Sequence, residues 1–153
     1  MSMDSSMKVE KLSEDDYSEW QQLYRGYADF YHMAMDEKIL TRVWEWIFDE
    51  EMEFYALSAK NDTGEMIGIM HYRQMPSPLR GLMVGFLDDL YVRPDCRGTG
   101  VVQALFESLN KEAKHNNWNY IRWITAKDND RARAVYDKIS EPIEFVTYHM
   151  SIK

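Results

Sequence analysis

The spacing of hydrophobic and polar positions along the chain predicts strands and helices in a mixed order. Side chains that alternate with a period of two predict six strands, at residues 7–12, 54–59, 66–72, 85–92, 120–126 and 145–152. Helical spacing predicts four helices: one after Ser13, one at about 37–48, one after Gly100 and one at 130–139. Residues 61–64 read as a hairpin turn and 75–81 as a loop. This order predicts an α/β fold whose sheet is mostly antiparallel, with one parallel crossover.

Composition narrows the class of protein. A chain of 153 residues with 45% hydrophobic side chains is long enough for one domain with a real core, and we expect 1–153 to be one domain with residues 1–6 as a flexible tail. A formal charge of −8 argues against a nucleic-acid partner, since a polyanion would be repelled. No apolar run is long enough to span a membrane, and the N-terminal residues lack the features of a signal peptide. One cysteine favours a reducing cytoplasm, and the four histidines have no metal-ligand spacing, so we expect no metal.

A glycine-bearing loop at a helix start is the strongest chemical signal. Arg97-Gly98-Thr99-Gly100 follows a strand and precedes an amphipathic helix. Free backbone N–H groups and the positive end of the helix dipole suit a phosphate anion there. No P-loop sequence occurs, and the dinucleotide fingerprint fails because Gln103 stands at its third glycine position. The loop is therefore either a phosphate site of another kind or, taken alone, an ordinary glycine-rich turn.

The run from Arg97 through Gly98, Thr99, Gly100 and Val101 to Val102 resembles the pyrophosphate-binding motif of the GNAT superfamily of acyl-coenzyme A N-acyltransferases. Val102 departs from that motif, and we expect its side chain to point at the sheet, away from the diphosphate. A second match, Asn129 to Tyr136, follows the family pattern Asn-x-x-Ala-x-x-x-Tyr at full spacing.

The resemblance extends over nearly the whole chain and carries several implications. It implies a sheet of about six strands with helices on both faces, whose fourth and fifth strands are splayed. It also implies acetyl-CoA as acyl donor, bound by the loop residues, by Asn129 and by the strand residues Leu90, Tyr91 and Val92, which would hold the pantetheine. Tyr136 would be the general acid for the leaving thiolate, and family habit suggests a homodimer.

The adjacent acids Asp88 and Asp89 resemble those of the diamine acetyltransferases, and the first helix resembles that of the yeast histone and small-basic-protein acetyltransferases. On a period of two, Asp88 shares a face with Leu90 and Val92, so we expect it to act as a base through a water. Asp89 points the other way unless the strand bulges, and is expected to hold substrate charge. The alternative for both is a structural pair at a sheet end.

The acceptor pocket in this resemblance lies at the end of the first helix, where Asp29 and Tyr31 are candidates for contact with a cation. The sequence therefore predicts an N-acetyltransferase acting on a primary amine, either a cationic small amine or a protein lysine. An amino acid or a drug amine is the alternative acceptor, and a non-catalytic coenzyme A-binding module is the alternative class.

Overall fold

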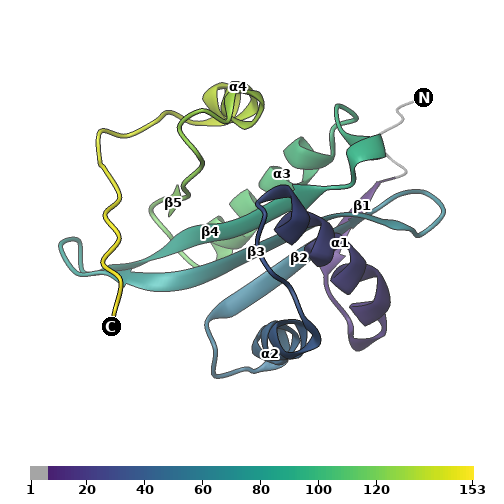
Figure 1. Cartoon of the computed structure of the whole chain (residues 1–153). Coiled ribbons are helices and arrows are strands. Elements are labelled where there is room, and N and C mark those ends of the chain that lie inside the picture. Colours follow the sequence, from purple (N-terminus) through teal and green to yellow (C-terminus); the bar gives the residue numbers. More distant parts are fainter. Residues whose placement is uncertain (1–6) are drawn as a thin grey trace. The chain divides into compact units, whose positions relative to one another are not determined.

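The computed structural model describes residues 7–153 (Figure 1), so the predicted tail 1–6 lies outside the described residues. The chain divides into two compact units, Met1–Trp123 and Ile124–Lys153. The first unit contains the whole sheet and three of the helices. The second contains one helix and the C-terminal segment.

The sheet has five strands, one fewer than the approximate number predicted. In spatial order these are β1 (Lys8–Lys11), β2 (Phe54–Lys60), β3 (Met66–Ser77), β4 (Leu82–Val92) and β5 (Ile121–Arg122). The first four pair antiparallel, and β5 pairs parallel with β4. The α/β fold with one parallel crossover is confirmed.

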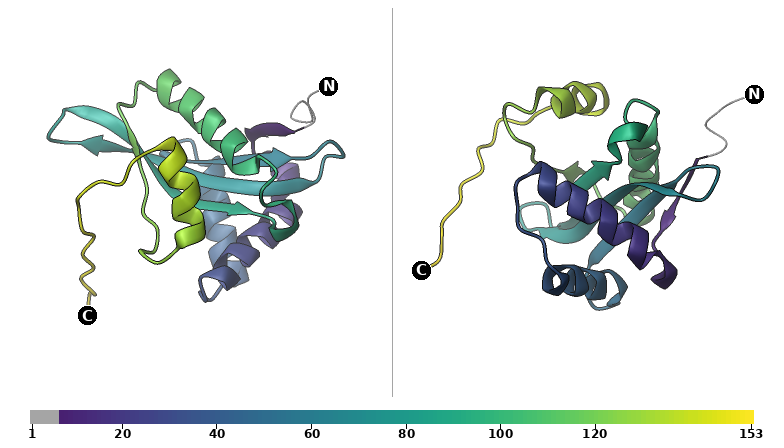
Figure 2. Two further views of the ribbon diagram at one scale, coloured as in Figure 1. Left: turned by 90° about the horizontal axis from the view of Figure 1, so that it is seen from above. Right: turned by 45° about the vertical axis from the view of Figure 1, so that its right-hand side comes forward.

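Helices cover both faces of this sheet, as Figure 2 shows. The helices α1 (Tyr17–Phe30) and α2 (Glu37–Phe48) pack on one face, and α3 (Val101–His115) packs on the other. Each helix follows its predicted apolar stripe, and α2 begins with an Asp36 side chain that accepts a hydrogen bond from the Ile39 backbone N–H.

Two hydrophobic clusters result from this layering. Leu105 and Leu109 of α3 are fully buried against the sheet, and Val102 packs beside them. The expectation that Val102 faces the sheet is therefore confirmed. On the opposite face, Trp20 of α1 and Leu40 of α2 are fully buried. These clusters hold the two helix layers to the strands that carry the acid pair.

Three predicted segments differ from the structure. The loop predicted at 75–81 shortens to a turn at 78–81, because β3 continues to Ser77 and β4 starts at Leu82, so that the two strands form one long hairpin. The strand predicted at 120–126 shortens to the two residues of β5. The strand predicted at 145–152 does not form. A strand needs backbone partners as well as alternation, and none pairs with that segment among residues 7–153.

The second unit consists of α4 (Asp130–Ile139) and a C-terminal segment without helix or strand. Hydrophobic side chains along this segment are largely exposed, including Phe145, Tyr148 and Ile152. Over the described part of the chain, no helix has the length and apolar character needed to cross a membrane.

Candidate functional site

A β-bulge sets the direction of the two adjacent acids on β4. In the pairing of β3 with β4, His71 lies opposite Asp89 and Tyr72 lies opposite Leu87, so Asp88 is the extra residue. A bulge of this kind breaks the strict alternation of a strand. Both acids consequently point to the α1–α2 face. The sequence prediction that Asp88 shares a face with Leu90 and Val92 is wrong, because those two side chains pack on the α3 side.

Asp88 is only partly paired in its site. Its Oδ1 accepts a hydrogen bond from the Arg73 guanidinium at 2.9 Å, while its Oδ2 is buried and has no hydrogen-bond partner. Burial raises the pKa of the Asp88 carboxyl above its ordinary value, and the charge of neighbouring Asp89 adds to the rise, although Arg73 opposes both. A carboxyl with a raised pKa and an unpartnered oxygen is suited to accept a proton.

The carboxylate of Asp89 has more hydrogen-bond partners than that of Asp88. Its Oδ2 lies 2.8 Å from His71 Nδ1 and accepts a hydrogen bond from the Tyr24 hydroxyl at 2.9 Å. Burial alone would raise the pKa of Asp89, but the hydrogen bonds from His71, Tyr27 and Tyr24 outweigh it and lower the pKa. The two neighbouring carboxyls thus have pKa values shifted in opposite directions. This divergence is typical of acid–base sites, in which one group stays charged while the other exchanges a proton.

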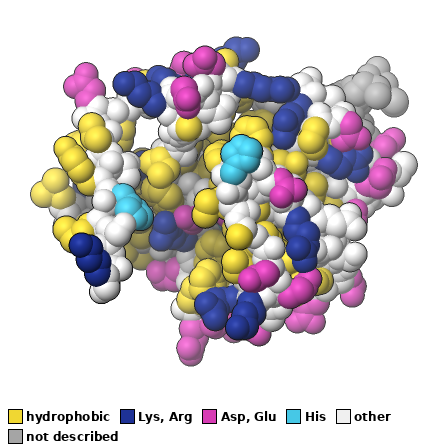
Figure 3. Space-filling view, in the orientation of Figure 1, with side chains coloured by type: hydrophobic (Ala, Val, Ile, Leu, Met, Phe, Trp, Pro, Cys, Tyr) yellow, Lys and Arg dark blue, Asp and Glu magenta, His cyan; other side chains and the backbone are white. Residues whose placement is uncertain are grey.

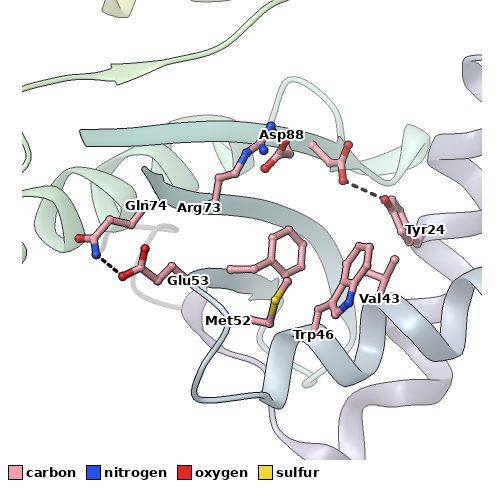
Figure 4. A pocket seen from close by; sticks show the side chains of 10 residues that line it. Tyr24, Val43, Trp46, Met52, Glu53, Arg73, Gln74 and Asp88 are labelled. Carbon is pink, nitrogen blue, oxygen red and sulfur yellow. Dashed lines mark hydrogen bonds and ion pairs between the residues drawn. The ribbon is translucent and has the colours of Figure 1, made fainter. Parts of the chain in front are cut away.

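Both acids line a pocket of about 530 Å³ within the first unit. Figure 4 shows Asp88 and Arg73 facing Trp46 and Met52 across this pocket. Its walls combine carboxylates, one guanidinium and aromatic rings, and consist of Tyr24, Val43, Trp46, Met52, Glu53, Phe54, Arg73, Gln74, Asp88 and Asp89. Three acids against one arginine make the lining negative. On the face shown in Figure 3, by contrast, acidic and basic side chains are interspersed.

The predicted phosphate loop has the backbone geometry that anion binding needs. Gly98 and Gly100 have φ angles of +79° and +89°, in the left-handed region that favours glycine. A Cβ placed on either would meet no atom within 4 Å, so open space lies beside the loop. Gly100 is the N-cap of α3, whose first backbone N–H groups have no acceptor inside the helix. The loop therefore fits a diphosphate.

Arg97, the first residue of the motif, lies beside the same loop. Its Nε donates to the Val92 carbonyl at 3.2 Å, and its guanidinium lies over the rings of Tyr91 and Phe30. These contacts hold the arginine between the loop and the end of β4. Thr99 closes the turn through a hydrogen bond from its hydroxyl to the Cys96 carbonyl.

The second half of β4 has an edge that no strand pairs with in the described chain. β5 pairs only with Gly85 and Phe86. The Arg93 N–H donates to Ile67 on β3, so the alternation of an antiparallel ladder directs the N–H groups of Leu90 and Val92 to the other edge. This agrees with the splay expected between the fourth and fifth strands.

Tyr91 lies on the opposite face of β4 from Leu90 and Val92. A Cβ at Gly26 of α1 would lie 2.6 Å from the Tyr91 hydroxyl, so the tyrosine packs against the helix at a position where only glycine fits. By the same alternation, its backbone N–H points toward β3. Of these two neighbouring residues, Val92 is therefore the one whose backbone N–H faces the open edge of β4.

The other predicted site residues are divided between the two units, with Asp29 and Tyr31 in the first and Asn129 and Tyr136 in the second. Asp29 and Tyr31 are exposed at the C-terminal end of α1 and do not line the pocket. In the second unit, the Asn129 side chain caps α4 by accepting the Ala132 N–H at 3.3 Å. Tyr136 lies on the same helix.

Several residues of the pocket cannot be identified from the sequence alone. The sequence gives no role to His71 beyond the absence of metal-ligand spacing, yet this residue is fully buried and its Nδ1 lies 2.8 Å from Asp89 Oδ2. Sequence reasoning also misses Arg73, Trp46 and Phe54 as site residues. The sequence contains one indication of these residues, because His71 and Arg73 are two positions apart and therefore lie on the same face of their strand. That face cannot be assigned to the acid pair without the register of β3 on β4.

A mixed sheet with an unpaired β4 edge and a glycine loop before α3 fits an acyl-CoA-dependent N-acyltransferase. The chain belongs to the acetyltransferase (GNAT) family, whose family model matches residues 17–140. It is an N-acetyltransferase with acetyl-CoA as its donor. The chain is also similar to the D-amino-acid N-acetyltransferase HPA3 of Saccharomyces cerevisiae, with 26% identity over 141 residues that cover 92% of this chain and 88% of that protein.

Solved structures show the same fold. A ribosomal-protein-alanine N-acetyltransferase from Brucella melitensis biovar Abortus 2308 aligns with a TM-score of 0.76 at 24% identity, covering 96% of this chain and 100% of the other. The aminoglycoside acetyltransferase AAC(6')-Iy, in complex with a CoA bisubstrate analogue, aligns with a TM-score of 0.83 at 17% identity over 96% and 99% of the two chains. At these identities the likeness concerns the fold.

Proposed function

We propose that the pocket beside Asp88 and Asp89 binds a cationic primary amine and that the enzyme transfers the acetyl group of acetyl-CoA to it. The observation that carries this proposal is the pocket lining, in which three carboxylates face one guanidinium and aromatic rings. The rings of Trp46 and Phe54 pack edge to face, with centroids 6.1 Å apart. Carboxylates together with aromatic faces favour an ammonium group through charge and cation–π attraction.

In this proposal Asp88 and Asp89 have different roles. Asp89, whose pKa is lowered, stays ionised and holds the ammonium. Asp88, whose pKa is raised, accepts a proton from the ammonium through a water. The neutral amine nitrogen then attacks the thioester carbonyl carbon, and one C–N bond forms as the carbonyl oxygen becomes an oxyanion. The Val92 backbone N–H is the proposed donor to that oxygen.

The attached nitrogen loses its second proton to solvent, and collapse of the tetrahedral intermediate breaks the C–S bond and releases the thiolate. Tyr136 is the proposed general acid for that thiolate, a role that rests on the Asn129–Tyr136 motif. A thiol has an ordinary pKa of about 8.5, so its protonation needs only modest help. We expect Tyr136→Phe to lower kcat more than it weakens acetyl-CoA binding. An equal loss in binding with unchanged kcat would remove this role.

A second candidate acceptor is an amino acid. Arg73 lies in the pocket with its side chain half exposed, and a guanidinium is the natural partner of a carboxylate. The similarity to a D-amino-acid N-acetyltransferase favours the same class. In that case the α-amino group would lie at the acid pair and the carboxylate at Arg73.

Thiol release from acetyl-CoA, measured with diamines, lysine peptides and D- and L-amino acids, tests these acceptors. Arg73→Gln separates them, because removal of this pocket cation should lower KM for a diamine and raise KM for an amino acid. If no amine accelerates thiol release, the proposed acceptor pocket is wrong. The homodimer and the cytoplasmic location remain predictions from the sequence, which size-exclusion chromatography and fractionation would test.

A further inference from the structure

A buried hydrogen-bonded chain runs from α1 through β3 to β4 and ends in the pocket. Trp20 Nε1 donates to His71 Nε2 at 3.0 Å, and His71 Nδ1 lies 2.8 Å from Asp89 Oδ2. Trp20 and His71 are both fully buried. The three residues lie far apart in the sequence, and only Asp89 is a site candidate on sequence grounds.

The direction of this chain follows from the chemistry of its first member. An indole N–H only donates, so His71 Nε2 must accept. The ring hydrogen of a neutral imidazole then lies on Nδ1, which donates to Asp89 Oδ2. A hydrogen on Nε2 would face the indole N–H without an acceptor between them. Trp20 therefore selects the one tautomer that donates to Asp89.

Further donors complete the environment of this carboxylate. The Tyr24 hydroxyl donates to the same Oδ2 that His71 contacts, at 2.9 Å. The Tyr27 hydroxyl also contributes to lowering the pKa of the Asp89 carboxyl. Burial and the nearby Asp89 charge raise the pKa of both phenols, so both keep their hydrogens as donors. Donors from two elements converge on the carboxylate and fix its orientation.

We propose that His71 is a positioning residue for the acceptor amine, and that Trp20 sets its tautomer so that Nδ1–H holds Asp89 ionised and aimed at the substrate ammonium. This inference rests on the proposed acceptor pocket. It assigns a role to a buried histidine that touches neither acetyl-CoA nor the reacting atoms. The alternative is that His71 only completes the hydrogen bonds of the buried core and has no role in amine binding.

Two polar substitutions at the same position separate these interpretations. In the variant His71→Asn, the introduced amide nitrogen reaches about where Nδ1 lies, so this variant keeps a donor for Asp89. In the variant His71→Gln, the longer side chain reaches about where Nε2 lies, so it contacts Trp20 and leaves Asp89 without that donor. Met70→Ala, at a fully buried neighbour on the opposite face, is the control for lost stability alone.

The main readout is the acidic limb of kcat/KM for a diamine between pH 4 and 9, a range that starts near the ordinary pKa of an aspartate because the pKa of Asp89 is lowered. Loss of a donor to the ionised acid pair raises the pH needed to ionise both carboxyls. We expect His71→Gln to move the acidic limb up by about one pH unit, which is about tenfold in kcat/KM on that limb, with KM affected more than kcat. His71→Asn should keep the limb near its wild-type position.

Other titratable or charged groups also face Asp89, and their charges affect the pH at which its carboxyl titrates. These are the phenols of Tyr24, Tyr27 and Tyr31 from the α1 region, Arg73 of β3, Glu53 before β2, and Asp88 beside it. Carbon-13 NMR of the Asp89 carboxyl reports its own titration without any substrate. We expect that titration to move up in His71→Gln and to stay in place in Met70→Ala.

Each outcome decides the proposal. An unmoved limb in His71→Gln, with activity reduced equally at every pH as in Met70→Ala, would make His71 purely structural. A moved NMR titration with an unmoved kcat/KM profile would also overturn it, since Asp89 would then be irrelevant to the substrate. If no amine is acetylated while the NMR titration moves as expected, the acceptor pocket fails and the His71–Asp89 coupling survives.

Discussion

The proposed role of Asp88 as base leads to a specific prediction for Asp88→Asn. This substitution keeps the shape of the side chain and a hydrogen-bonding oxygen for Arg73, but it removes the proton acceptor. An alkylamine has a pKa near ~10.4, so neutralising its ammonium at pH 7 costs about 4.6 kcal/mol. A positioned base contributes roughly 100- to 10,000-fold to such a reaction. We therefore expect kcat/KM at pH 7 to fall by about 100-fold or more.

The pH profile is more diagnostic than the size of the loss. With Asp88 present, the enzyme binds the ammonium and deprotonates it, so kcat/KM should be flat from above the pKa of Asp88 to that of the amine. Without the base, only the rare neutral amine reacts. In Asp88→Asn, kcat/KM should rise about tenfold for each pH unit up to the pKa of the amine.

Continuous thiol release from acetyl-CoA with a diamine, between pH 6.5 and 10, measures both profiles. Asp89→Asn is the matched control, because it should raise KM through the loss of the anion yet keep the flat profile of the wild type. A flat profile for Asp88→Asn, or a loss below threefold at pH 7, would refute the assignment of Asp88 as base.

The same pair of variants gives a second readout that needs no substrate. Because the folded-state pKa of Asp88 is raised, its ionisation opposes folding at neutral pH and has no effect below the unfolded pKa of about 3.9. Asp88→Asn should therefore raise Tm at pH 7, and the gain should shrink below the folded pKa of Asp88 and vanish near the unfolded pKa of about 3.9. The lowered pKa of Asp89 predicts the opposite sign for Asp89→Asn, with a loss at pH 7 that shrinks in acid. Thermal unfolding by circular dichroism across pH measures both.

Three further predictions concern the loop, the core and the pocket wall. Gly98→Ala should cost about 1–2 kcal/mol of backbone strain and raise KM for acetyl-CoA, whereas Gly64→Ala, at φ +84° in a remote turn, should carry the strain without the KM effect. Leu105→Ala should lower the unfolding free energy by about 2–5 kcal/mol in urea titrations, because its side chain is fully buried. Leu79→Ala, 94% exposed, should change it by less than about 0.5 kcal/mol. Trp46→Ala should raise KM for a diamine about 2- to 30-fold, and an unchanged KM would exclude a cation–π contact there.

Local patterns in the sequence are enough for most of the elements. The apolar stripes of α2 and α4 place both helices at their observed bounds, since helical spacing is a property of neighbouring residues. The anion loop is also readable, because a contiguous run from Arg97 to Gly100 contains its glycines and its position before a helix. The loop residues that are predicted to bind the diphosphate of acetyl-CoA are likewise neighbours in the sequence.

Segments that depend on pairing are less predictable. Alternation at 145–152 predicts a strand, yet alternation supplies no partner, and none pairs with those residues in the described chain. The tip of the long hairpin of β3 and β4 resembles a loop in the sequence because Pro76 and Pro78 are turn signals. Proline removes only one backbone N–H donor, and a strand tolerates it at a position where the paired strand does not accept a hydrogen bond from that N–H.

The sequence by itself determined the class of this protein, because the two motifs that carry the family resemblance, Arg97–Val102 and Asn129–Tyr136, are each contiguous along the chain. Only the tertiary structure decided how the residues of the proposed acceptor pocket are arranged. The bulge that brings Asp88 and Asp89 to one face exists only in the register of β4 on β3. The contact from Trp20 through His71 to Asp89 joins residues that meet only when α1 packs on that sheet. Their opposite pKa shifts follow from burial and donors, which a linear sequence does not contain.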